Sequence, residues 1–205
     1  YLMVIAKNSL EIKRDIVSKN MENGLLPFSK RYLGSLDNHF STIGLVGMNE
    51  ASLNLFGKDI TTKEGHDFSV RVLEYMRKRL QDFQEKTGNL YNLEATPAEG
   101  TSYRLAKEDK KKYPDIITAG ETTPYYTNSS QVPVDKTSDV FEQIEIEEDL
   151  QTLYTGGTVF HTFLGERMNK DQARTMVKRL THNSELPYIT LTPNYSISPD
   201  HEYET

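Results

Sequence analysis

The 205-residue sequence contains no cysteine and no tryptophan. The absence of cysteine excludes a disulfide, a thiolate metal site, a cysteine nucleophile and a thiyl radical carried by this chain. No apolar run approaches the roughly 18 residues that a membrane-spanning helix needs. The apolar start, Tyr1–Ala6, has neither the basic flank nor the cleavage site of a signal peptide, so we expect a cytoplasmic protein.

Positive charge is also in short supply. The sequence has 24 Lys and Arg residues against 30 Asp and Glu residues, which gives a net charge of −6. A nucleic-acid polymer or an anionic membrane would require a basic surface, and we expect neither as a partner. A small phosphorylated ligand is compatible with this charge, because backbone N–H groups can bind phosphate.

What the sequence does contain is an alternation of helical and strand patterns. Helices are predicted over residues 2–21, 49–56, 63–86, 101–112, 140–153, 159–167 and 170–181, and strands over 39–48, 90–95 and 186–193. This order is typical of an α/β protein with a mainly parallel sheet, and the lack of repeats or low-complexity linkers favours one continuous unit.

Two of the predicted helices have distinctive patterns. The helix over 63–86 carries one apolar stripe, which consists of Phe68, Val72, Tyr75, Met76, Leu80 and Phe83. The many carboxylates of residues 140–153 predict a solvated acidic helix.

The sharpest candidate site is EATPAEGTSYR at residues 94–104, which follows a predicted strand and opens a predicted helix. Its small and hydroxyl-bearing residues are Thr96, Gly100, Thr101 and Ser102. They suit an anion site, because the first amides of a helix are unpaired and its dipole favours negative charge. Arg104 could add positive charge. The alternative is an ordinary cap, in which Thr101 or Ser102 caps its own helix and binds nothing.

Three further segments carry polar residues or glycines next to predicted element ends. YTNSSQ at residues 126–131 suits hydrogen bonding to ribose or phosphate, or is a polar turn. Gly156 and Gly157 either permit close approach of a ligand or form a tight turn. Asn49 and Glu50 follow a predicted strand, where ligands of parallel sheets collect. Alternatively, Asn49 caps the next helix.

The five histidines show no metal-binding spacing, so no complete metal site is expected. His161 lies in an apolar predicted helix, where a structural role is favoured over a catalytic one.

Several longer strings together resemble the anaerobic (class III) ribonucleoside-triphosphate reductases, which are glycyl-radical enzymes. The strings are KRYLG at 30–34, DNHFSTIGLVGMNE at 37–50, GNLYNLEATPAEGTSYRLAK at 88–107, YYTNSSQ at 125–131, LYTGGTVFH at 153–161 and LPYITLTP at 186–193. The resemblance covers essentially the whole chain. It implies a single segment over residues 1–205 that forms the later, C-terminal part of the ten-stranded α/β barrel of glycyl-radical enzymes and ribonucleotide reductases.

The resemblance also implies an activity and its partners. Such enzymes reduce ribonucleoside triphosphates to deoxyribonucleotides for DNA replication, and an ATP-binding domain often regulates them. A radical-SAM activase with an iron–sulfur cluster generates their glycyl radical. The implied partners are a ribonucleoside triphosphate, this activase and a second copy of the full enzyme in a homodimer. No cofactor is expected on this chain itself.

The resemblance assigns substrate contacts residue by residue. The substrate phosphates are expected against Thr96, Ala98, Glu99, Gly100, Thr101 and Ser102, and the rest of the substrate is expected to face Asn128, Ser129 and Ser130. Asn49, Glu50, Gly156 and Gly157 are further candidates.

The sequence departs from the family pattern at functional positions. The cysteine that forms the thiyl radical would lie upstream of Tyr1, and the glycyl-radical motif would lie beyond Thr205. In YSISPDHEY at 195–203, Ser198 stands where the family has a zinc-binding Cys, and His201 alone is insufficient for a site. We therefore expect a fragment with no metal and no catalytic residue, inactive by itself. The alternative is a non-catalytic nucleotide-binding or structural chain of a split or remnant reductase.

Overall fold

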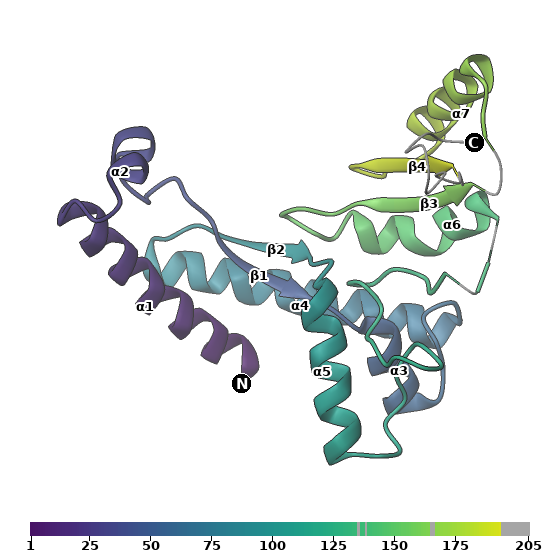
Figure 1. Ribbon diagram of the computed structural model, residues 1–205, viewed down its shortest axis with the longest axis horizontal. Coiled ribbons are helices and arrows are strands. Elements are labelled where there is room, and N and C mark those ends of the chain that lie inside the picture. Colours follow the sequence, from purple (N-terminus) through teal and green to yellow (C-terminus); the bar gives the residue numbers. More distant parts are fainter. Residues whose placement is uncertain (135, 138, 165–166, 194–205) are drawn as a thin grey trace, which may run out of the picture.

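The computed structural model describes residues 1–134, 136–137, 139–164 and 167–193. Its elements in chain order are α1 (Leu2–Glu22), α2 (Pro27–Leu33), β1 (Ser41–Leu45), α3 (Met48–Phe56), α4 (Lys63–Thr87), β2 (Tyr91–Ala95), α5 (Glu99–Lys112), α6 (Val140–Gln151), β3 (Phe160–Leu164), α7 (Lys170–Asn183) and β4 (Ile189–Pro193) (Figure 1). The α/β class and most predicted elements are confirmed. No helix in these ranges is long and apolar enough to cross a membrane.

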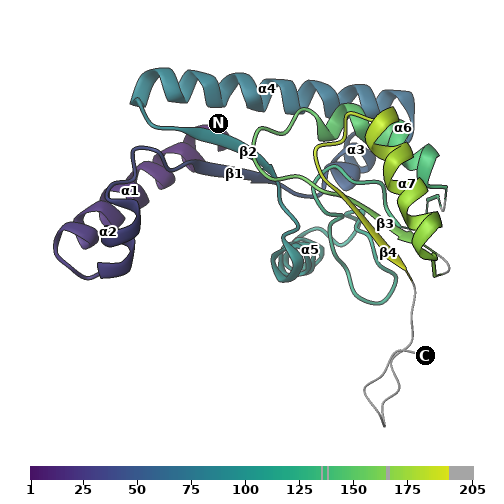
Figure 2. The same cartoon turned by 90° about the horizontal axis from the view of Figure 1, so that it is seen from above.

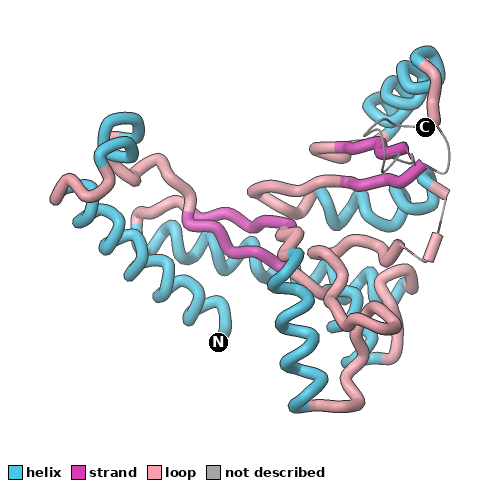
Figure 3. The backbone as a smooth tube through the Cα atoms, in the orientation of Figure 1, coloured by secondary structure: helices cyan, strands magenta, loops and turns pink. Residues whose placement is uncertain are grey.

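The strands form two separate parallel pairs instead of the one sheet expected from the sequence (Figure 3). Strand β1 pairs with β2, with Ser41 opposite Tyr91 and Leu45 opposite Ala95. Strand β3 pairs with β4, with Phe160 opposite Ile189. Parallel pairing aligns the carboxyl ends of β1 and β2 at one edge, which is where the candidate site lies.

Helix α4 lies along one face of the β1–β2 pair (Figure 2). The Thr62 hydroxyl caps its start by accepting a hydrogen bond from the Gly65 N–H at 3.2 Å. Its buried face carries Leu73, Leu80 and Phe83, which join the main core with Leu93 of β2. The predicted stripe included Tyr75, but this side chain is 55% exposed and Leu73 is buried instead.

The predicted helix over 159–167 is wrong, because residues Phe160–Leu164 form strand β3. Phe160 and Thr162 are buried and Phe163 is exposed, which is the alternation of a strand with one covered face. Pairing with β4 supplies the backbone hydrogen bonds that a helix would otherwise provide. The sequence prediction also missed α2, where Pro27 occupies the first turn of a new helix.

The prediction of a solvated acidic helix holds for only part of α6. Glu142, Glu145 and Asp149 are exposed, but Glu147 is completely buried. Ile144 packs in a second core cluster with Phe160 of β3. The helix therefore has a buried side, and that side includes a carboxyl group.

Candidate functional site

Three stretches of chain meet beyond the carboxyl ends of β1 and β2. Helix α3 begins three residues after β1, helix α5 begins four residues after β2, and residues 126–132 run against both. The Gly47 N–H donates to the Thr127 carbonyl at 2.8 Å, and the Met48 N–H donates to the Ser129 carbonyl at 3.0 Å. Gly47 has a φ of +76°, and a Cβ there would lie 3.1 Å from the Cβ of Tyr126, so the contact requires glycine.

The start of α5 is an uncapped helix end beside an open hollow. The helix begins at Glu99, and Ala98 precedes it with a φ of +54° and no side-chain cap. The N–H groups of Gly100 and Thr101 have no hydrogen-bond partner in the described part of the chain. The hollow measures about 600 Å³ and is lined by Thr96, Pro97, Ala98, Glu99, Gly100, Thr101 and Arg104.

The structure contradicts the expectation that Thr101 or Ser102 caps this helix. Thr101 and Ser102 lie inside the first turn of α5, so neither occupies the capping position. Thr101 and Arg104 are exposed at the hollow. The unpaired amides, the positive end of the helix dipole and the Arg104 guanidinium together can hold an anion.

Ser102 has a different place from its neighbours. It is buried, and its hydroxyl donates to the Tyr126 carbonyl at 2.5 Å and accepts from the Tyr126 N–H at 2.9 Å. The Ser102 side chain therefore ties α5 to residues 126–132 and does not line the hollow.

The three candidates in residues 126–132 are not equivalent. Asn128 is half-buried, and among the described residues only its backbone carbonyl, and not its side-chain amide, takes part in a hydrogen bond. Ser129 is 2% exposed and has a φ of +41°, and Ser130 is 1% exposed. The Ser130 hydroxyl accepts from the Tyr154 hydroxyl at 2.9 Å, and burial raises the pKa of Tyr154 to about 12. Of the three side chains, only that of Asn128 is accessible to a ligand.

Backbone strain coincides with the two predicted binding segments. Ala98 and Ser129 are the residues other than glycine with positive φ in the described part of the chain. This conformation costs roughly 1–3 kcal/mol per residue and clusters at functional sites. The strain thus marks the start of α5 and residues 126–132 as candidates on grounds independent of residue type.

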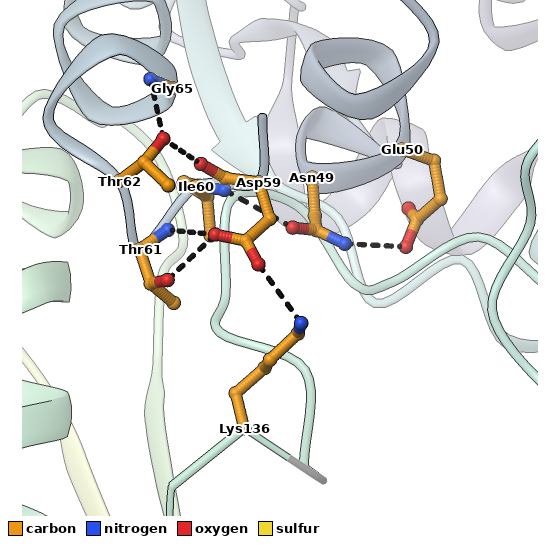
Figure 4. A network of polar contacts seen from close by, with 8 residues as sticks. All are labelled: Asn49, Glu50, Asp59, Ile60, Thr61, Thr62, Gly65 and Lys136. Atoms are coloured by element: carbon orange, nitrogen blue, oxygen red, sulfur yellow. Dashed lines mark hydrogen bonds and ion pairs between the residues drawn. The ribbon is translucent and has the colours of Figure 1, made fainter. Parts of the chain in front are cut away.

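Asn49 and Glu50 are buried at the start of α3 and face other protein groups (Figure 4). The Asn49 amide donates to Glu50 Oε1 at 3.0 Å, and Asn49 Oδ1 accepts from the Ile60 N–H at 3.3 Å. Gly47 occupies the capping position of α3, so the idea that Asn49 caps this helix is wrong. Glu50 also accepts from the Thr127 N–H at 2.9 Å and from the Thr127 hydroxyl at 2.6 Å.

The loop between α3 and α4 extends this polar network (Figure 4). Asp59 accepts from the Thr61 N–H at 3.1 Å and the Thr61 hydroxyl at 2.6 Å. It also forms an ion pair with Lys136 at 2.9 Å. The chain that leaves residues 126–132 is therefore anchored to the same α3–α4 loop that contacts Asn49.

Gly156 and Gly157 lie along the second edge of β2. The Gly156 N–H donates to the Leu93 carbonyl at 2.7 Å, and the Gly157 carbonyl accepts from the Ala95 N–H at 2.8 Å. A Cβ on Gly156 would lie 3.0 Å from the Leu93 carbonyl oxygen. The structure thus uses Gly156 for close backbone packing. His161, expected to be structural, lies on β3 with Nδ1 2.7 Å from the Thr190 hydroxyl of β4.

Glu147 is a site residue that the sequence reasoning missed. Its carboxyl group accepts from the Val132 N–H at 2.8 Å, from Gln151 at 2.9 Å and from Gln143 at 3.3 Å. Burial raises the pKa of Glu147 to about 6, although these three hydrogen bonds act in the opposite direction. The spacing of Gln143, Glu147 and Gln151, four residues apart on one helix face, was a signal that could have identified it.

No group of three His, Cys, Asp or Glu side chains that could hold a metal ion occurs in the described ranges. Ser198 and His201, whose surroundings resemble the start of the family's zinc site, lie outside the described residues.

This chain matches a family model, curated proteins and solved structures of anaerobic ribonucleotide reductases. The family model described as "Anaerobic ribonucleoside-triphosphate reductase" matches residues 1–205. The protein of that name from Enterobacteria phage T4 is 31% identical over 124 residues, which are 60% of this chain and 20% of the phage protein. The protein of that name from Escherichia coli K12 is 24% identical over 120 residues, which are 58% of this chain and 17% of that protein.

Solved structures extend the similarity to nearly the whole chain. The anaerobic ribonucleotide reductase from Thermotoga maritima with dATP bound in the specificity site is 26% identical, with a TM-score of 0.79 over 99% of this chain and 34% of that one. The same enzyme in complex with dATP and CTP is 25% identical, with a TM-score of 0.79 over 99% and 33% of the two chains. This chain therefore spans about a third of these solved relatives and about a fifth of the curated ones.

Proposed function

The chain belongs to the anaerobic ribonucleoside-triphosphate reductase family, and we propose that it contributes the substrate phosphate and ribose contacts of such an enzyme. The proposed reaction of the whole protein is the reduction of a ribonucleoside triphosphate to the deoxyribonucleotide. The observation that carries the proposal is the uncapped start of α5, with free Gly100 and Thr101 N–H groups at an open hollow. The CTP complex of the T. maritima relative supports a nucleotide as the ligand class.

The proposed binding mode follows from the geometry. The triphosphate lies at the start of α5, where the amides of Gly100 and Thr101 and the Arg104 guanidinium meet its negative charge. Ser102 acts indirectly, by fixing Tyr126. Asn128 is the proposed ribose contact, because its amide is accessible and offers both a donor and an acceptor to a hydroxyl group.

The radical chemistry is assigned to other parts of the proposed enzyme. Without cysteine, these 205 residues cannot supply a thiyl radical. The proposal therefore places no catalytic residue, cofactor or metal on this chain. The glycyl radical, the zinc site, the activase with its SAM and iron–sulfur cluster, the homodimer and closure of a ten-stranded barrel are proposed for the complete enzyme.

A substitution at Gly100 tests the phosphate site. Gly100 lines the hollow and a Cβ there meets no atom within 4 Å, so we expect Gly100→Val to fill space in the hollow with little effect on the fold. We expect CTP to bind the complete reductase about ten- to hundred-fold more weakly, because one or two charge-assisted hydrogen bonds of roughly 1.5–3 kcal/mol are lost. Isothermal titration calorimetry on the complete enzyme measures this.

The control for this test is Thr181→Val, which places the same side chain at an exposed position of α7. It should leave CTP binding unchanged. Equal affinities of Gly100→Val and the control would show that the start of α5 binds no phosphate.

A further inference from the structure

We propose that Glu50 and Glu147 are positioning residues, which hold residues 126–132 from opposite ends so that Asn128 is presented to the nucleotide. This inference rests on the proposed function, because it takes Asn128 to be a substrate contact. Neither carboxyl group is accessible: Glu50 is 1% exposed and Glu147 is 0% exposed. Both act through the backbone of the segment and not on the substrate.

The two carboxyl groups bind equivalent atoms at the two ends of the segment. Glu50, from α3, accepts the N–H of Thr127 at 2.9 Å. Glu147, from α6, accepts the N–H of Val132 at 2.8 Å. Asn128 lies between them, one residue after the first anchor. Helix α3 precedes the segment in the sequence and α6 follows it, so only the folded chain brings the two anchors together.

Intermediate contacts complete the support of the segment. The Ser129 carbonyl accepts from the Met48 N–H at 3.0 Å, and the Ser130 hydroxyl accepts from the Tyr154 hydroxyl at 2.9 Å. Ser129 has a φ of +41°, a strained conformation that persists only when surrounding contacts impose it. Each buried carboxyl group adds one contact to a backbone N–H of the segment, at 2.9 Å for Glu50 and 2.8 Å for Glu147.

The hydrogen-bond partners of both carboxyl groups are all donors. Glu50 accepts from Asn49, from the Thr127 N–H and from the Thr127 hydroxyl. Glu147 accepts from Val132, Gln143 and Gln151. A glutamine at either position keeps the volume but directs an NH₂ group at some of these donors. Glu50→Gln and Glu147→Gln therefore loosen the segment with little change in packing.

The test is a double-mutant cycle with Asn128→Ala, measured on the complete reductase. With Asn128 present, each Glu→Gln variant should raise the CTP dissociation constant and the KM for CTP about 5- to 30-fold, as expected for one misplaced hydrogen bond. In the Asn128→Ala background the same variants should change both constants less than twofold, because the contact that they position is already absent. Glu145→Gln, at an exposed position of α6, is the matched control and should change nothing.

The outcomes separate this inference from the proposed function. If Gly100→Val and Asn128→Ala both bind CTP as the unmodified enzyme does, the proposed function fails. If those two weaken binding but the Glu→Gln effects are the same with and without Asn128, the carboxyl groups are only structural and the inference is overturned. Should Glu50→Gln fail to fold by circular dichroism, Thr127→Val takes its place. It removes only the hydroxyl bond to Glu50 and should show the same coupling to Asn128.

Discussion

The buried carboxyl group of Glu147 makes stability depend on pH in a way that can be calculated. Its pKa in the folded protein is about 6, against an ordinary value of 4.5. Between these values the folded state binds more protons than the unfolded state, so this group lowers the free energy of unfolding as the pH rises. The difference of about 1.5 pKa units corresponds to at most about 2 kcal/mol, present fully below pH 4.5 and lost as the pH rises through about 6.

The perturbation that isolates this contribution is Glu147→Gln, which cannot titrate. Other carboxylates also titrate in this range, so the informative quantity is the difference between the unmodified protein and the variant. Glutamine, like the protonated carboxyl group, directs a donor at Val132, Gln143 or Gln151, so its own cost is at most about 1–3 kcal/mol. This cost is independent of pH. The advantage of the unmodified protein over the variant should therefore shrink by about 2 kcal/mol between pH 4.5 and pH 7.

Urea unfolding monitored by circular dichroism at half-unit steps of pH measures the difference. The control is Glu145→Gln on the exposed side of α6, whose curve should run parallel to that of the unmodified protein. A direct check is carbon-13 NMR of the Glu147 carboxyl carbon, which should titrate near pH 6. If the Glu147→Gln curve is parallel to the unmodified one from pH 4.5 to pH 7, burial does not raise this pKa and the reasoning is refuted.

Two further predictions concern packing and chemistry. Gly156→Ala should lower the free energy of unfolding by about 1–3 kcal/mol, because the added Cβ lies 3.0 Å from the Leu93 carbonyl oxygen. Thermal unfolding measures this loss, and an equally stable variant would contradict the close packing of Gly156 against β2. Gly100→Ala is its control, since its Cβ meets open space and should cost nothing. The 205-residue chain alone should give no deoxyribonucleotide and no glycyl doublet in EPR when it is incubated with activase, SAM and reductant. The reason is that it has no cysteine to form a thiyl radical. Either signal would show that the radical chemistry is wrongly assigned to other residues.

The sequence by itself determined the features that depend on near neighbours. The stripe of α4 at three- and four-residue spacing predicted a helix over 63–86, and the structure places it at Lys63–Thr87. Strands β1 and β2 were also predicted, β1 from the apolar and β-branched residues within 39–48 and β2 as a strand over 90–95. The family was also determined at this level, because long strings of residues resemble its members and the family model matches them.

Local patterns failed where an element depends on a distant partner. Residues 160–164 lie within the predicted apolar helix over 159–167, which includes Val159, Phe160 and Phe163. They form β3 because β4, almost 30 residues later, offers its edge for pairing. Local spacing contains no information on whether that edge is available. It therefore cannot decide between a helix and a strand for these residues.

The details of the candidate site were decided by the tertiary structure alone. The sequence indicated which polar residues surround the ends of β1 and β2, but it treated Asn49, Glu50, Ser129 and Ser130 as open to a ligand. In the folded chain all four side chains are buried, and those of Asn49, Glu50 and Ser130 hydrogen-bond to other protein groups, whereas Asn128 is only half-buried. Glu50 meets Thr127 across 77 positions of sequence, and Glu147 meets Val132 across 15. A buried carboxyl group is stable only when hydrogen-bond donors surround it. These donors come from segments that only the tertiary structure brings together, so the local sequence does not reveal them.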